Sequence, residues 1–258
     1  MKLKFLKYKI LKNITIGKTK KHYKEKYKKI KQLNTKYPIN GTNNQLILVD
    51  DIQEEYVEFK LINNLTLKVD GSNNVLKINK NDLLEGTLNI NIDFKGNNNI
   101  CTFSKKVRGN WNITCYGDNN LFKVGENTSC GEFSIALHSN HFEIGDNCMI
   151  SSSEELWTDG HSVLDYETRE VINIPKTPII IGNHVWLGRR CTLTKGAQIP
   201  DDCIVGIGSV ITKKFTEPHC VIAGNPAKIV KTGVTWDGRR PLTYKNEFEK
   251  ENKRKENF

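Results

Sequence analysis

Aliphatic residues return at every sixth position between residues 181 and 211, and mostly small residues return four positions after each of them. The aliphatic series is Ile181, Leu187, Leu193, Ile199, Val205 and Ile211. The second series is Val185, Cys191, Ala197, Cys203, Ser209 and the larger Phe215. A period of six fits neither an amphipathic helix nor an alternating strand. It fits a chain wound as a triangular coil with inward-pointing aliphatic residues, so the stretch predicts a mainly β solenoid.

Gly-Asn motifs punctuate the chain between residues 40 and 150. They are GTNN (41–44), GSNN (71–74), GNNN (96–99) and GDNN (117–120), followed by GEN (125–127) and GDN (145–147). Gly and Asn tolerate the left-handed backbone conformation that sharp corners need. The spacing between motifs falls from 30 to 25 to 21 residues, so we expect irregular early coils that approach eighteen residues. A β-sandwich with frequent turns is the alternative for this part alone.

The solenoid pattern sets the domain boundaries. We expect the coil to span residues 39–232, with a loop thrown out of it over about 151–178, where the sequence is polar and ends at two prolines. Long excursions from a rigid scaffold commonly carry function. After Phe215 the hexad rhythm stops, which predicts a cap on the open end of the coil. Residues 233–258 read as a polar C-terminal tail.

The net charge of +10 is concentrated at the N-terminus. Fourteen lysines and one glutamate give residues 1–37 a charge of +13, so the other residues together carry −3. Segment 1–38 therefore predicts a short basic helix, which either touches an anionic membrane or polymer or packs its apolar side on the coil. This distribution argues against a nucleic-acid-binding protein.

No apolar run approaches the ~20 residues that span a bilayer, and no signal peptide is apparent. We expect a cytoplasmic protein, with peripheral contact at the inner membrane face as a further expectation. Seven cysteines, an odd number without a CxxC pair, predict buried free thiols in a reducing compartment. Neither CxxC nor HExxH occurs, so we expect no metal site.

His161, in the sequence TDGHS of the expected loop, is the sharpest candidate for chemistry. An imidazole, with an ordinary pKa of ~6.5, suits a general base near neutral pH. Its other ring nitrogen could be held by Asp159, Asp165 or Glu143, and spacing does not choose among them. The alternative is a plain exposed loop histidine. His138 and His141 have metal-pair spacing, but surface histidines at a corner explain them better.

Two other features are candidates for a binding site. Trp186 falls at the last position of its hexad and should face outward, where it either packs on a neighbour or enters an active site. Four lysines near the end of the coil could clamp phosphates or simply be solvated: Lys213, Lys214, Lys228 and Lys231. No P-loop or dinucleotide fingerprint is present, which disfavours nucleotide hydrolysis and dinucleotide redox chemistry.

The hexads IGNHVWLGRRCTL and IVGIGSVITK, with the end motif VIAGNPAKIVK, resemble the left-handed β-helix hexapeptide-repeat acyltransferases over about residues 120–231. Within that superfamily, DGHS followed by HVWLG looks most like the O-acetyltransferases of bacterial capsules and other surface polysaccharides, including the polysialic acid type. The resemblance implies a left-handed parallel β-helix, a homotrimer with active sites between subunits, and acetyl-CoA as acetyl donor.

By motif position the resemblance assigns His161 as the base and Trp186 as its partner in the site. It also implies coenzyme contacts at Gly188, Arg189, Ile207, Thr212, Lys213, Lys228 and Lys231. The last two positions are often arginine elsewhere, which keeps charge but loses bidentate geometry. The basic arm and irregular early coils depart from the compact sugar acetyltransferases, so the acceptor is less defined than the donor.

These features predict direct transfer of acetyl from acetyl-CoA to a sugar hydroxyl, with His161 taking the hydroxyl proton. The basic arm favours a polyanionic saccharide acceptor. One alternative is an N-acetyltransferase that acts on an amino sugar or a nucleotide sugar. Another is a non-catalytic solenoid that binds glycans.

Overall fold

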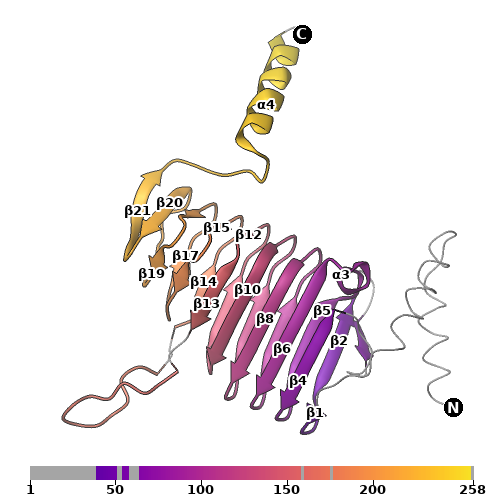
Figure 1. Cartoon of the computed structure of the whole chain (residues 1–258), viewed down its shortest axis with the longest axis vertical. Coiled ribbons are helices and arrows are strands. Elements are labelled where there is room, and N and C mark those ends of the chain that lie inside the picture. The colour runs from indigo at the N-terminus through magenta and orange to yellow at the C-terminus, as the bar shows by residue number, and fades with distance from the viewer. Residues whose placement is uncertain (1–38, 51–53, 58–63, 158–159, 175–176, 257–258) are drawn as a thin grey trace, which may run out of the picture.

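Parallel strands stack along the length of the chain, so that the backbone winds as a coil of flat-sided turns (Figure 1). The computed structural model describes residues 39–50, 54–57, 64–157, 160–174 and 177–256. The expected left-handed parallel β-helix is confirmed. The predicted helix within the basic segment 1–38 lies outside the described residues.

Three sheets form the walls of the coil. The first runs in the order β1 (Ile39–Asn40), β4 (Leu65–Asp70), β6 (Leu88–Lys95), β8 (Arg108–Tyr116), β10 (Ser129–His138), β12 (Met149–Ile150), β15 (Trp186–Leu187), β18 (Ile204–Val205), β20 (Cys220–Gly224) and β21 (Ala227–Thr232), with β13 (Ser153–Trp157) also paired to β10. The second runs β17 (Gln198–Ile199), β14 (Ile179–Ile181), β11 (His141–Ile144), β9 (Leu121–Val124), β7 (Ile100–Phe103), β5 (Val75–Asn79), β2 (Gln45–Val49) and β3 (Glu54–Val57). The third is the pair β16 (Thr192–Leu193) and β19 (Val210–Ile211).

The turns of the coil narrow toward the C-terminus. Paired residues lie 30, 25, 21 and 20 positions apart in successive turns that begin at β2, β5, β7 and β9. After the loop the separation is 18 in each sheet. Every residue of both six-residue series is buried, which confirms their inward direction.

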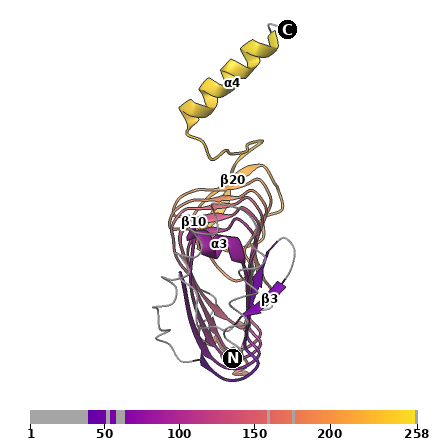
Figure 2. The same cartoon turned by 90° about the vertical axis from the view of Figure 1, so that its right-hand side faces the viewer.

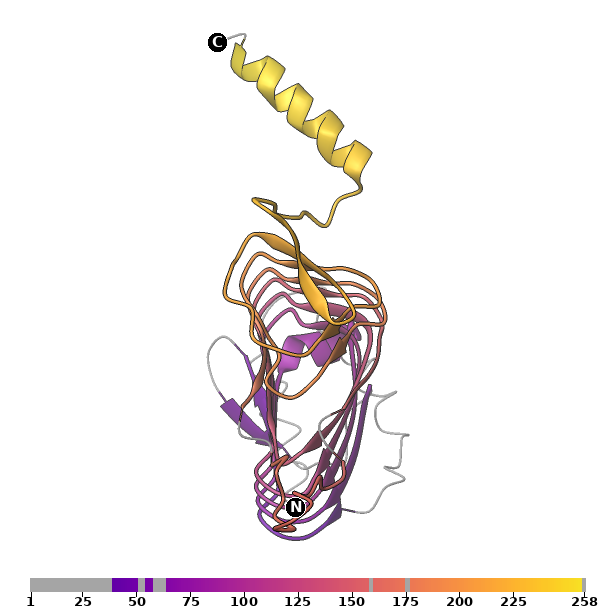
Figure 3. The same cartoon turned by 90° about the vertical axis from the view of Figure 1, so that its left-hand side faces the viewer.

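Aromatic side chains fill the wide part of the coil, which is seen along its length in Figures 2 and 3. Phe122 lies 5.8 Å from the rings of both Phe103 and Phe142, and Trp111 lies 5.1 Å from Phe133. Aliphatic residues, alanine and cysteine fill the narrow part. The turn length therefore follows the volume of the side chains that each turn encloses.

The Gly-Asn corners are built as expected, because a residue with left-handed backbone recurs at each one: Asn43, Asn73, Asn98 and Asn119. The asparagine that follows points inward and forms a ladder. In it the amide oxygens of Asn74, Asn99 and Asn120 each accept a 2.9 Å hydrogen bond from the backbone N–H one turn later. The ladder satisfies backbone groups that the corners remove from the sheets.

We expect Asn99→Ala to lower the free energy of unfolding by about 1–3 kcal/mol, because the buried N–H of Asn120 loses its acceptor. The midpoint of urea unfolding at fixed protein concentration measures the change. Asn91→Ala, at an exposed position of β6, should stay within ~0.5 kcal/mol of the unmodified chain. Equal shifts in the two variants would contradict a stabilising role for the ladder.

Antiparallel strands close both ends of the stack. β21 pairs antiparallel with β20, which confirms the predicted cap, and β3 pairs antiparallel with β2 at the other end. A short helix, α3 (Lys80–Glu85), interrupts the wall between β5 and β6. Its first turn is capped by the side chain of Asn79.

The C-terminal region differs from the polar tail that the sequence predicts. Residues 241–256 form helix α4 (Pro241–Glu256), which stands away from the coil in all three views (Figures 1–3). Its sequence has no continuous apolar stripe, so helical periodicity gave no signal. In the described part of the chain, no helix is both long and apolar enough to cross a membrane.

All seven cysteines are buried and unpaired by disulfides, as predicted. Burial raises the pKa of Cys130 and Cys220 to about 12 and that of Cys148 to about 11. Thiols with such pKa values are poor nucleophiles, so we assign them to packing.

Candidate active site

His161 lies at the base of the protruding loop. The coil continues through β13, beyond the expected start of the excursion at residue 151, and residues 160–174 then stand clear of it (Figure 1). Asn173 closes the base of this loop, because its Oδ1 accepts from Val163 N at 2.8 Å and its Nδ2 donates to His161 O at 2.8 Å. The backbone of His161 is therefore held, while its side chain is exposed.

The chain next to His161 passes over His138, at the end of β10. A methyl group on Gly160 would lie 3.7 Å from His138 Nε2. The His138 ring stacks on Tyr116 at 4.7 Å, and Lys95 Nζ lies 4.7 Å from the other partner of the stack, the Tyr116 ring. Burial lowers the pKa of His138, and the nearby His161 lowers it further. His138 is thus half-buried beside the candidate base, whereas the sequence indicated a surface histidine.

The carboxylates proposed to orient His161 have other partners. Glu143 Oε1 lies 2.7 Å from His141 Nε2. Asp165 caps the loop tip, where hydrogen bonds from Thr168 and Glu167 hold the pKa of its carboxyl below the ordinary value. Asp159 lies outside the described residues. Within the described ranges, no group of three or more His, Cys, Asp or Glu side chains is placed to hold a metal ion.

Trp186 faces outward from β15, as its hexad position predicts, with 38% of its surface exposed. Its indole Nε1 donates to Ser151 Oγ at 3.4 Å. The ring centroid lies 6.3 Å from that of Trp236, from the C-terminal region. An exposed indole with a weakly engaged N–H can donate to a ligand instead.

Three of the expected coenzyme contacts share the corner that follows Trp186. A methyl group on Gly188 would lie 2.8 Å from Ile207 N, so the two corners stack directly on each other. Gly208 N donates to Arg189 O at 2.9 Å, which joins the same corners. Ile207 is 73% exposed and projects an apolar side chain from this edge.

The end-motif lysines continue the same wall. Lys231 pairs with Val221, which pairs with Ile204, which pairs with Trp186. Lys228 pairs with Ala223, whose Cβ packs against Gly206 of the next corner. Both lysines are exposed, so they extend the wall from Trp186 with positive charge.

Thr212 and Lys213 lie at a different corner. They follow β19 of the third sheet, where Lys213 O accepts from Gln198 N at 3.3 Å and Lys213 Nζ lies 5.4 Å from the Phe215 ring. The third sheet therefore separates them from the corner that holds Gly188 and Ile207.

One chain does not bring His161 and Trp186 together. Trp186 pairs with Met149, which pairs with Ser129 at the start of β10, whereas the backbone before His161 lies over His138 at its end. β10 has ten residues, which corresponds to about 30 Å of extended strand. A general base and a transition-state donor must lie within hydrogen-bond reach of one reacting group.

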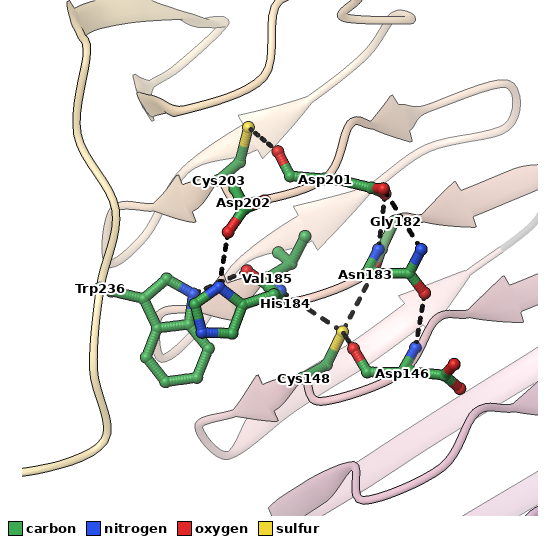
Figure 4. A network of polar contacts seen from close by, with 10 residues as sticks. All are labelled: Asp146, Cys148, Gly182, Asn183, His184, Val185, Asp201, Asp202, Cys203 and Trp236. Atoms are coloured by element: carbon green, nitrogen blue, oxygen red, sulfur yellow. Dashed lines mark hydrogen bonds and ion pairs between the residues drawn. The ribbon is translucent and has the colours of Figure 1, made fainter.

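A histidine–carboxylate pair that the sequence analysis missed lies beside Trp186 (Figure 4). His184 Nδ1 lies 2.7 Å from Asp202 Oδ1, and the His184 ring stacks on Trp236 at 4.5 Å. His184 and Asp202 are 18 positions apart, one full turn of this part of the coil. That spacing was the available signal, because equivalent positions in successive turns lie next to each other.

Comparison with known proteins identifies the repeats and two groups of relatives. Residues 178–213 match the family described as hexapeptide repeat of succinyl-transferase. A polysialic acid O-acetyltransferase of Neisseria meningitidis is 40% identical over 184 residues, which cover 70% of this chain and 82% of that protein. A polysialic acid O-acetyltransferase of Escherichia coli O1:K1 / APEC is 33% identical over 115 residues, 44% of this chain. The match spans only 37% of the length of that E. coli relative.

Two crystal structures have the same architecture over most of this chain. The polySia specific acetyltransferase NeuO gives a TM-score of 0.64 at 25% identity, over 80% of this chain and 89% of that one. The polysialic acid O-acetyltransferase OatWY gives 0.63 at 31% identity, over 79% and 92%. The similarity therefore extends well beyond the hexads into the wide turns.

Proposed function

The chain belongs to the hexapeptide-repeat acyltransferase family that includes the polysialic acid O-acetyltransferases, and from this premise we propose that it transfers acetyl from acetyl-CoA to a hydroxyl group of a bacterial surface polysaccharide. The observation that carries the proposal is the 40% identity to the Neisseria meningitidis enzyme over 82% of its length. The exposed His161 on the loop and the outward Trp186 on the coil support the chemistry.

The active site is assembled from two copies of the chain, in a homotrimer. The distance of about 30 Å along β10 prevents His161 and Trp186 of one copy from sharing a substrate. The loop also exposes apolar side chains that are costly in water: Val163, Leu164, Tyr166, Val171, Ile172 and Ile174. Docking of this loop on a neighbouring coil buries them and carries His161 toward the neighbour's Trp186.

His161 acts as the general base in this site. It removes the proton from the acceptor hydroxyl as that oxygen attacks the thioester carbonyl of acetyl-CoA. The tetrahedral intermediate then expels the CoA thiolate, which takes the proton from the His161 imidazolium. The new ester bond forms as the thioester C–S bond breaks, without an acyl-enzyme. The buried thiols, with their raised pKa values, offer no nucleophile for one.

Trp186 supplies the donor that stabilises the oxyanion. Its indole N–H, which reaches Ser151 Oγ at 3.4 Å, can turn to the developing negative charge. A single oriented donor of this kind typically contributes ~3–4 kcal/mol of barrier lowering.

The wall between Trp186 and the end-motif lysines is the proposed site of acetyl-CoA. Ile207 offers an apolar contact for the pantetheine arm, and Lys228 and Lys231 offer positive charge to the phosphates. Gly188 and Arg189 form the corner between them. Thr212 and Lys213 lie across the third sheet, so their contact with the coenzyme is proposed through a second copy.

A polyanionic saccharide is the proposed acceptor. The relatives are named for polysialic acid, and residues 1–37 carry a charge of +13 that attracts such a polymer or an anionic membrane surface. Seven free, buried cysteines favour a reducing compartment, so the cytoplasm, with peripheral contact at the inner membrane face, is the proposed location.

The test is an acetyl-transfer assay with purified protein, acetyl-CoA and a panel of acceptors. The panel contains polysialic acid, a neutral oligosaccharide, an amino sugar and a nucleotide sugar, and product is identified as ester or amide by its lability to mild base. We expect a base-labile O-acetyl product on the polyanionic saccharide. Base-stable product on an amine would support the N-acetyltransferase alternative instead.

Binding of the donor separates an enzyme from an inert solenoid. Acetyl-CoA at 100 times its Kd should stabilise the fold by ~2.7 kcal/mol, visible as a raised melting temperature. No thermal shift and no transfer to any acceptor would contradict the proposed function and favour a glycan-binding role.

A further inference from the structure

The C-terminal chain turns back onto the coil before α4 begins. We call residues 233–240 the strap. Val234 N donates to His219 O at 2.9 Å, and Trp236 Nε1 donates to His184 O at 2.7 Å. These bonds join the strap to corners that lie 15 and 52 positions earlier in the sequence. The strap is therefore fixed to the body of the coil, unlike the helix that follows it.

Trp236 packs on a corner whose other contacts are also fixed (Figure 4). The rings of Trp236 and His184 are nearly parallel, with an angle of 13° and a centroid distance of 4.5 Å. The edge of the His184 ring lies 2.7 Å from Asp202, and His184 N donates to Asp146 O at 2.7 Å. His184 also has a left-handed backbone, with a φ of 52°, which a non-glycine residue adopts only when its surroundings hold it.

The held corner is two residues before Trp186. The Trp186 ring lies 6.3 Å from Trp236 at an angle of 47°, and on its other edge Nε1 meets Ser151. With 38% of its surface exposed, Trp186 would otherwise be free to change rotamer. Trp236 thus forms a wall that restricts the indole, while the His184–Asp202 pair restricts the backbone that carries it.

The far end of the strap is tied to α4. Arg239 donates to both carboxylate oxygens of Asp237, at 2.8 and 2.9 Å, and to Glu247 Oε2 at 2.7 Å. Hydrogen bonds from Arg239 lower the pKa of Asp237 to about 2. The turn after Trp236 therefore keeps its shape over the pH range in which the enzyme would work.

We propose that Trp236 is a positioning residue that fixes the orientation of the Trp186 indole, an inference that rests on the proposed function of Trp186 as oxyanion donor. A donor lowers the barrier only when it already points to the place where charge develops. Loss of Trp236 should then reduce turnover rather than substrate binding, because the interaction it supports is made in the transition state.

The first experiment compares Trp236→Leu, Trp236→Phe and Phe248→Leu in the full-length protein. Leucine removes the stack and the indole N–H, phenylalanine keeps a ring, and Phe248 is an exposed aromatic on α4 outside the strap. We expect kcat to fall about tenfold in Trp236→Leu, with KM for both substrates within about twofold. Trp236→Phe should recover to within about threefold of the unmodified enzyme, and Phe248→Leu should be unchanged.

A double-mutant cycle distinguishes positioning from a general structural effect. If Trp236 acts through Trp186, Trp236→Leu should cost nothing further in a Trp186→Leu background. Multiplied losses in the double variant would overturn the proposal, as would unmodified kcat in Trp236→Leu. If Trp236→Leu does not fold, the cycle is run with Trp236→Phe, and a loss there that is multiplied by Trp186→Leu has the same meaning.

A spectroscopic measurement tests the geometry without activity. Two indoles at 6.3 Å should give an exciton couplet in the circular dichroism of the folded protein, lost in both Trp236→Phe and Trp186→Phe and retained in Phe248→Leu. Absence of transfer in the unmodified protein, with the couplet present, would contradict the proposed function and leave the aromatic contact supported. Transfer without a Trp236-dependent couplet would overturn the positioning role alone.

Discussion

Replacing His161 with alanine is expected to lower the rate of acetyl transfer by about 10²–10⁴-fold, because the acceptor hydroxyl loses its base. His161 is exposed on the loop and its backbone is held by Asn173, so the substitution should leave the fold and assembly intact. Initial rates at saturating acetyl-CoA, with the molecular mass from light scattering, measure both effects. Activity above a tenth of the unmodified rate would contradict the assignment.

Two other histidines control this experiment. His141→Ala changes a histidine that pairs with Glu143 on the second sheet, and we expect at most a twofold change in rate. His184→Ala tests the rival base, because His184 has the carboxylate partner that His161 lacks among the residues the structure describes. If His184→Ala abolishes transfer while His161→Ala does not, the base is His184 and the proposed mechanism is wrong.

Replacing Trp186 with leucine is expected to lower kcat by about 10²-fold, from loss of the oxyanion donor. The larger consequence concerns where the site is. When chains carrying His161→Ala and Trp186→Leu are co-expressed in equal amounts, each interface has one chance in four of pairing an intact His161 with an intact Trp186. About a quarter of the unmodified activity should therefore return in mixed trimers, although both parents are nearly inactive.

The mixing experiment has a clear negative. If each chain carried a complete site, every chain in the mixture would still lack one residue, and activity would stay at the level of the parents. Separately purified homotrimers combined under conditions that prevent subunit exchange provide the control, and they should remain inactive. Recovery in that control would mean that residual activity, not complementation, explains the result.

Short-range regularity is what made the fold predictable. The aliphatic series from Ile181 to Ile211 repeats a local packing requirement six times, so the buried positions could be assigned without knowledge of distant residues. The Gly-Asn corners were equally local, because a left-handed residue such as Asn98 is needed wherever the chain turns sharply. The width of the early turns was not, since it depends on how Phe103, Phe122 and Phe142 pack together across turns.

The site was predicted in its parts and not in its arrangement. His161 and Trp186 stand out by position in the sequence, but their separation depends on the length of β10, which no local pattern sets. The contact between Trp236 and His184 joins positions 52 apart through one hydrogen bond and one ring stack. Such a contact leaves no period in the sequence, whereas the 18-residue spacing of His184 and Asp202 does.

The change in turn length has a consequence for how sequences of this kind can diverge. After the loop every turn has 18 residues, so inserting or deleting one residue within a strand would move each later aliphatic residue out of the interior. Before the loop the turns already differ, with 30, 25, 21 and 20 residues, because corners and helix α3 absorb the extra length. Relatives should therefore vary in length on the N-terminal side of His161, while the segment that carries Trp186 and the end-motif lysines keeps its count.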